Sequence, residues 1–161
     1  MKIISKNTLL VNVALFVLIN FYVNLSNAQT MKNYPLTAKG TFVVDLKPDG
    51  QNKIGDITFG KYVIQKIFKG DLDATSKVDM LSAGSDNGSG AYVALESIAG
   101  TLNGRNGTFV LMHSGTRTKT SQQLTVIVVP GCSTGDLIGL EGKLTINIVG
   151  KEHSYIFEYS L

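Results

Sequence analysis

Three side chains that can transfer a proton or hold a polar group fall within one predicted hairpin. Asn103-Gly104 stands between two alternating runs and is a strong hairpin signal, because both central positions of a type I′ turn need a positive φ. The resulting register pairs Ala94 with His113 and makes Tyr92 and Glu96 the diagonal neighbours of the imidazole. The hairpin therefore gathers an acid, an imidazole and a phenol on one largely apolar face.

This face suggests chemistry because burial in apolar surroundings raises the pKa of a carboxyl and suits it to proton transfer near neutral pH. Glu96 and His113 are therefore candidate catalytic residues, and Tyr92 and Phe109 are candidate ligand contacts on the same face. The alternative is a buried hydrogen-bonded trio that fixes the hairpin, since structural networks also perturb pKa values. The opposite face is also partly apolar, so hydrophobicity leaves open which face lines the interior. Its apolar residues are Val93, Leu95, Val110 and Met112.

A second candidate site is the segment Val128–Leu137, where an apolar strand opens into a glycine-flanked turn of small hydroxyl residues. Backbone N–H groups in such a turn suit an oxyanion, with Ser133 and Thr134 as ligand contacts, and the alternative is a tight strand connection. Cys132 has no activating partner nearby in sequence, so we expect a small packing residue. Tyr155, a further candidate ligand contact, belongs to the last strand, whose aromatic face we expect in the core or interior wall.

The sequence supplies few groups for a metal, a cofactor or a nucleic acid. Its two histidines and single cysteine show no metal-ligand spacing, and the glycine-rich run over 84–90 lacks the lysine and helix of a phosphate-binding loop. The formal charge is +3, and loss of the two lysines at positions 2 and 6 with a leader reduces it to +1. The basic residues are also scattered, so we expect no nucleic-acid partner, no metal and no cofactor.

Residues 1–28 have the features of a cleaved secretory signal. An apolar run over 9–23 follows two lysines, and Ser26 and Ala28 place small residues at the specificity positions of a signal-peptidase site. A membrane anchor is the alternative, because the run approaches the length that spans a bilayer. We expect cleavage after Ala28, leaving an exported, periplasmic or extracellular protein without a stable membrane anchor. Residues 29–37 would form an N-terminal lead-in.

Residues 38–161 are predicted to form one all-β domain. Alternating or β-branched runs recur between glycine-rich turns, whereas helical spacing is missing from the pattern. The predicted strands are Leu36–Leu46, Ile57–Phe68, Thr75–Ala83, Ala91–Leu102, Arg105–Ser114, Gln123–Val129, Asp136–Leu140, Lys143–Val149 and His153–Tyr159. Such antiparallel strands must hide their edges, which favours a closed barrel of about eight strands over a two-sheet sandwich.

Four segments of this domain, in their order and spacing, resemble the family catalogued as domain of unknown function 3224. These segments are Phe68–Leu72, Ala91–Glu96, Gly100–Gly115 and Val129–Leu137. The resemblance implies an eight-stranded antiparallel barrel with a central cavity, similar in fold to allene oxide cyclase. Those cyclases use a cavity glutamate to position a water and steer an apolar epoxide, and Glu96 is analogous in type, though not by matched position. Cys132 and Ser133 depart from the serine-glycine step of the family pattern.

These observations leave three functions open. The first is a barrel that binds a small, mostly apolar molecule in its cavity. The second is a cyclase-like or isomerase-like enzyme that uses Glu96 as its cavity carboxylate. The third is a structural or subunit-interaction module, such as a homo-oligomer, with its interior filled by side chains. A cavity in the structure would separate the first two functions from the third.

Overall fold

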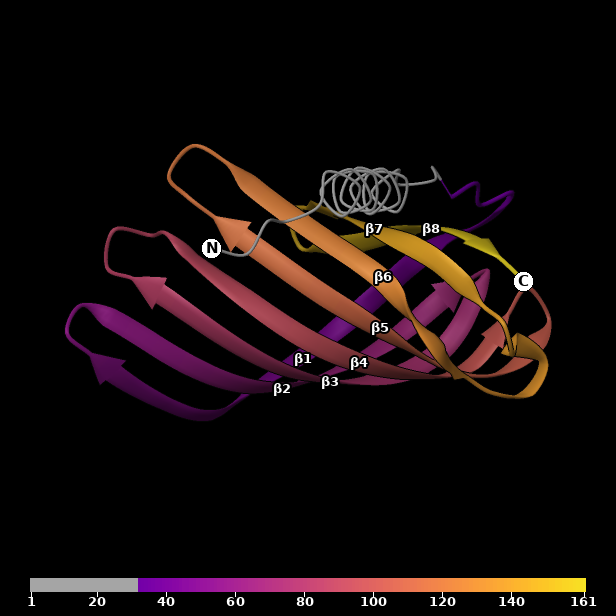
Figure 1. Cartoon of the computed structure of the whole chain (residues 1–161), viewed down its shortest axis with the longest axis horizontal. Helices are drawn as coiled ribbons and strands as arrows, with labels where there is room; N and C mark the ends of the chain where they lie inside the picture. The colour runs from indigo at the N-terminus through magenta and orange to yellow at the C-terminus, as the bar shows by residue number, and fades with distance from the viewer. Residues whose placement is uncertain (1–31) are drawn as a thin grey trace, which may run out of the picture. The chain divides into compact units, whose positions relative to one another are not determined.

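Short turns rich in glycine and asparagine separate eight strands, each of which pairs with the next along the chain (Figure 1). The computed structural model describes residues 32–161, so the predicted signal at 1–28 lies outside the described residues. The elements are β1 Leu36–Ile54, β2 Ile57–Gly70, β3 Leu72–Ser85, β4 Gly90–Leu102, β5 Arg105–Arg117, β6 Gln122–Ser133, the 3₁₀ turn η1 Gly135–Leu137, β7 Glu141–Val149 and β8 Glu152–Ser160. Because β8 also pairs with β1, the sheet closes on itself, which confirms the predicted antiparallel barrel.

One predicted strand does not form, and others are longer than predicted: β3 begins at Leu72 and β6 ends at Ser133. The segment Asp136–Leu140 is not a strand, because Gly135 and Gly139 have φ values of 63° and 90° and bend the chain on either side of the 3₁₀ turn. The first strand does not end at Leu46 but continues to Ile54 through a bulge between Pro48 and Gly50. Proline is tolerated there because the pairing of β1 with β8 ends earlier, at Phe42, and leaves a free strand edge.

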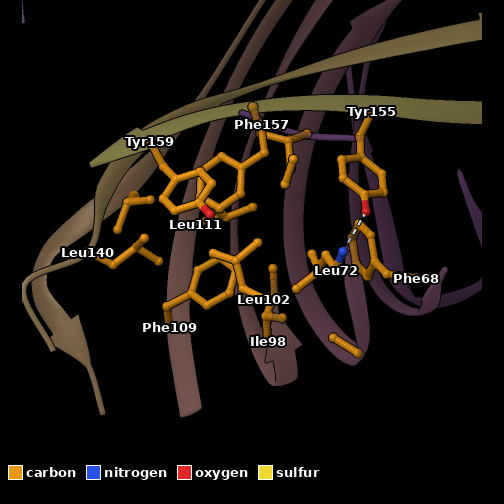
Figure 2. Close-up of a cluster of buried hydrophobic side chains, with 14 of the residues drawn as sticks. Phe68, Leu72, Ile98, Leu102, Phe109, Leu111, Leu140, Tyr155, Phe157 and Tyr159 are labelled. Carbon is orange, nitrogen blue, oxygen red and sulfur yellow. Dashed lines mark hydrogen bonds between the residues drawn. The ribbon is translucent and has the colours of Figure 1, made fainter. Parts of the chain in front are cut away.

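One end of the barrel is filled by a cluster of buried apolar side chains, many of them aromatic (Figure 2). Phe157 stacks on Phe109, with ring centroids 5.7 Å apart, and is tilted against Tyr159 at 5.2 Å. Leu137 and Leu140 from the 3₁₀ segment are also buried here and close the end of the barrel. Tyr155 fits into this apolar layer because its hydroxyl accepts a 2.9 Å hydrogen bond from the backbone N–H of Leu72. We call this region the closed end.

The other end is open because the wall is uneven in height. β7 and β8 have nine residues each, whereas the hairpins formed by β1 to β6 extend well past the turn between β7 and β8 (Figure 1). Val44 and Leu46 follow Phe42 on the same face of β1, yet their exposed fractions are 39% and 48%, against 5% for Phe42. The interior face of the long strands is therefore uncovered at this end, which we call the open end.

Candidate functional site

The β4–β5 hairpin turns Glu96 and His113 into the barrel. Asn103 and Gly104 have φ values of 47° and 81°, as a type I′ turn requires, and the register pairs Ala94 with His113 as predicted. The exposed fractions of Glu96 and His113 are 0% and 4%, so the face that carries them lines the interior. This answers the question that hydrophobicity left open. On the outer wall, Val93, Leu95 and Met112 are exposed.

Inside the barrel, four polar residues form a buried group that we call the Glu96 cluster: Lys66, Ser76, Glu96 and His113. Nζ of Lys66 lies 2.7 Å from Oε2 of Glu96, and Nε2 of His113 lies 2.8 Å from the same oxygen. The hydroxyl of Ser76 donates to Oε1 at 2.5 Å. The ammonium of Lys66 also lies 5.2 Å from the ring centroid of Phe42, a cation–π contact. Every charged atom of the cluster is therefore held in place by partners.

These partners determine how Glu96 titrates. Burial acts most strongly and by itself raises the pKa of Glu96, as the sequence suggested. The hydrogen bond from His113, together with the charge of Lys66 and the hydrogen bonds from Lys66 and Ser76, outweighs burial, so the pKa lies below its ordinary value. The expectation of a raised pKa is thus wrong, because it considered the apolar face without the cation opposite. Glu96 is a stably ionised carboxylate.

Lys66 and Ser76 were missed by the sequence prediction, although a signal for Lys66 was present. Lys66 alternates with Ile64 and Phe68 on one face of the predicted second strand. A lysine between two interior apolar residues needs a buried acid, since an unpaired buried charge is very costly. The sequence did not predict the register of β3 with its two neighbours. This register brings Lys66 on β2 within reach of Glu96 on β4.

The open end contains a cavity of about 310 Å³. Its lining comes from β3 to β6 and their connections: Met80, Ser82, Ala83, Gly84, Ser85, Gly88, Ser89, Gly90, Ala91, Tyr92, Gly115, Thr116, Arg117, Gln122, Gln123 and Leu124. Met80 and Tyr92 also pack on a small buried cluster of Ile64, Val78 and Ala94. Because Val78 pairs with Glu96 and Ala94 with His113, this apolar cluster lies beside the Glu96 cluster, whose members are not among the described residues that line the cavity.

The interior face of β4, β5 and β6 changes in character from the mouth of the cavity inward. The outermost row is Gly90, Arg117 and Gln122. The next rows are Tyr92, Gly115 and Leu124, followed by Ala94, His113 and Val126. The lining is therefore charged and polar at the mouth, apolar within, and closed below by buried side chains.

Tyr92 is the predicted ligand contact that the structure places on the cavity wall. It is half-buried, and its ring lies over Gly115 on the neighbouring strand, where a Cβ atom would collide with Cε1 of the ring. Burial and the negative charge of Glu96 raise the pKa of the Tyr92 hydroxyl, so it stays protonated at neutral pH. Gly115 thus sets the position of the ring.

The structure places the other predicted contacts away from this cavity. Phe109 and Tyr155 are buried in the closed end, each with an exposed fraction of 1% (Figure 2). Ser133 pairs with Phe109 at the end of β6. Thr134 is exposed, and its Oγ1 accepts a 3.1 Å hydrogen bond from the backbone N–H of Thr108. Their ligand-binding role stays a prediction, and the geometry of this turn is that of a tight strand connection.

Three further findings concern residues 32–161. Cys132 is exposed, so the expectation of a packing residue is wrong. Within this described part, His, Cys, Asp and Glu side chains form no group of three that could hold a metal ion. The same residues contain no helix long and apolar enough to cross a membrane.

Comparison with known proteins identifies relatives of this barrel. A family model described as "Protein of unknown function (DUF3224)" matches residues 38–159. The crystal structure of a protein of unknown function from the DUF3224 family, from Shewanella oneidensis MR-1, is 37% identical, with a TM-score of 0.74. That similarity covers 78% of this chain and 96% of the other. No curated protein gives a significant match.

Proposed function

Since the chain belongs to the DUF3224 family, whose description assigns no function, we propose its function from the cavity: it is an exported barrel that binds a small, mostly apolar molecule at its open end. The observation that carries this proposal is the cavity of about 310 Å³ above a fully packed closed end. Its volume lies at the lower end of the roughly 300–1,000 Å³ of small-molecule sites. The ligand is therefore small.

The character of the lining supports an apolar ligand. Met80, Tyr92 and Leu124 contribute large apolar surfaces inside the mouth, and the glycines beside them leave room for the bound molecule. Hydroxyl and amide groups from Ser82 and Gln122 supply a few polar contacts. Such a mixture of apolar wall and few polar groups is typical of small-molecule pockets.

The position and charge of Glu96 favour binding over the cyclase-like alternative. A glutamate that transfers a proton at neutral pH benefits from a raised pKa and must reach the substrate. The pKa of Glu96 is lowered, and Glu96, whose exposed fraction is 0%, is not among the described residues that line the cavity. From the resemblance to the allene oxide cyclase barrel, we therefore propose only a barrel with a ligand cavity, and we do not propose the cyclase reaction.

The cavity also favours binding over a purely structural module, because a barrel with only a structural role can be filled by side chains along its whole length. In this chain the filling stops at the Glu96 cluster and the small apolar cluster beside it. Export is the second part of the proposal and rests on the leader-like residues 1–28.

The test is isothermal titration of octanol, a small apolar probe, into the purified protein. Leu124 lines the cavity and its exposed fraction is 38%, so Leu124→Trp should fill the cavity at little cost to folding. Leu81→Trp is the matched control, because Leu81 is 57% exposed on the outer wall. We expect octanol to bind the wild type and Leu81→Trp, and to bind Leu124→Trp at least tenfold more weakly. Equal affinity for all three proteins would refute the proposed site.

A further inference from the structure

Arg117 is the single charged residue among those that line the cavity. It lies on β5 at the mouth, in one row with Gly90 on β4 and Gln122 on β6. Its side chain is exposed, and Nε donates a 3.2 Å hydrogen bond to the backbone oxygen of Gly88. That bond fixes the guanidinium against the β3–β4 turn and leaves its two terminal amino groups for other partners.

Acidic residues near the mouth do not neutralise this charge. Asp86, in the β3–β4 turn, is paired with Lys53, whose Nζ lies 3.2 Å from Oδ2. Within residues 32–161, Arg117 itself makes no salt bridge with a described acid. Among the described residues that line the cavity, Arg117 therefore supplies one positive charge that no described acid pairs with.

The cavity wall is polar at the mouth and apolar inside, and this difference would orient a bound molecule. Tyr92 and Leu124 occupy the row directly inside Arg117, and Met80 lies on the adjacent strand β3. A molecule with its apolar part against these three side chains would have its outer end at the guanidinium and the amide of Gln122. Guanidinium groups bind carboxylates through two parallel hydrogen bonds, which gives both strength and orientation.

We propose that the ligand of this cavity is a small amphiphilic carboxylate, with its anionic head bound by Arg117 at the mouth and its apolar body against Met80, Tyr92 and Leu124. This inference rests on the proposed binding function and narrows its ligand class. Arg117 acts as the specificity-determining residue for the carboxylate. The apolar wall contributes affinity that is the same for a neutral molecule with the same apolar body.

The experiment compares two probes with the same chain and different heads, octanoate and octanol. Each is titrated into the wild type, Arg117→Gln and Arg105→Gln. Arg105 is the matched control because it is an exposed arginine on the same strand, at the opposite end of β5. Circular dichroism checks that each variant is folded, and Arg117→Lys supplies a variant that keeps the charge without the planar fork.

We expect octanoate to bind the wild type and Arg105→Gln at least tenfold more tightly than Arg117→Gln, with Arg117→Lys in between. Octanol should bind the wild type and Arg105→Gln alike, and its affinity should fall far less than that of octanoate in Arg117→Gln. Wild-type affinity for octanoate should also fall as salt is added, because the arginine is exposed, while affinity for octanol should not. This salt series tests the inference even if Arg117→Gln fails to fold.

Two results would contradict the account in different ways. If octanoate and octanol bind the wild type equally, and neither responds to Arg117→Gln, the anionic head is refuted and the apolar cavity stands. If neither probe binds the wild type, the proposed binding function fails, and the inference about Arg117 fails with it.

Discussion

Lys66 and Glu96 form a buried ion pair in which each residue depends on the other. The exposed fractions of the Lys66 and Glu96 side chains are 8% and 0%, so bulk water does not solvate the remaining charge if its partner is removed. A buried pair is itself weak evidence for stability, but an uncompensated buried charge is strongly destabilising. The cluster therefore fixes how β2, β3, β4 and β5 meet inside the barrel.

A double-mutant cycle tests this dependence. Glu96→Gln and Lys66→Met should each lower the free energy of unfolding by about 3–5 kcal/mol, because each leaves one buried charge without its counter-ion. The double variant should lose at least about 1 kcal/mol less than the sum of the two losses. Urea denaturation of the four proteins gives these values.

The control cycle uses the exposed pair of Lys61 and Asp49, with Nζ 2.6 Å from Oδ2. Lys61→Met and Asp49→Asn should each leave the unfolding free energy nearly unchanged, because an exposed ion pair contributes little to stability. Strict additivity at Lys66 and Glu96, as at the surface pair, would show that the buried pair does not act as a unit.

The lowered pKa of Glu96 predicts acid sensitivity. The ordinary value is 4.5, so as the pH falls below it the unfolded chain takes up a proton before the native state does. The stability that this shift contributes is thus complete above that pH and is lost as the pH falls through the native pKa. The stability advantage of the wild type over Glu96→Gln should shrink between about pH 7 and pH 3. A constant difference in urea unfolding across this range would contradict the prediction.

At the level of elements, the β4–β5 hairpin was predictable because Asn103-Gly104 constrains both turn type and register. Glu96 was accordingly placed from sequence as a diagonal neighbour of His113, and the two side chains lie in hydrogen-bonding contact. Connections without such a signal were less predictable. Leu137 and Ile138, between the glycines at 135 and 139, are equally consistent with a short strand. Only the burial of Leu137 and Leu140 in the structure shows that this segment closes the end of the barrel. The family resemblance implied a central cavity, but its place at the open end could not be predicted, because it depends on how the short β7 and β8 align with the longer hairpins.

The contact of Tyr92 with Gly115 gives a prediction about two neighbouring strands. Gly115→Ala should lower the unfolding free energy by about 1–3 kcal/mol, because the new methyl group displaces the Tyr92 ring. Gly84→Ala is the control, since its Cβ would meet Ser89 at an ordinary 3.8 Å, and should change stability by less than about 1 kcal/mol. Urea denaturation measures both. Equal effects would mean that the ring is not held by the glycine.

At the scale of the whole molecule, the barrel divides into a closed end filled by apolar side chains and an open end that contains the cavity. Its outer wall exposes Leu81, Val93 and Leu95, and a homo-oligomer formed through such a surface stays a prediction. The family membership supports the fold and names no ligand, so the proposed ligand binding rests on the cavity alone.

The proposed export gives a prediction about the chain as it exists in the cell. The mature protein should begin at Gln29, because Ser26 and Ala28 occupy the specificity positions for signal peptidase. Intact-mass measurement of protein from the cell envelope decides this. A membrane-bound species that still carries residues 9–23 would identify the segment as an anchor.

The central claim is that the open end holds a small molecule, and native mass spectrometry of protein purified from its own cell envelope tests it most directly. We expect wild-type protein and the outer-wall variant Leu81→Trp to carry the same small additional mass, which is absent from the cavity-filling variant Leu124→Trp. A bound mass retained by Leu124→Trp, or a wild-type protein without any bound mass, would contradict the account.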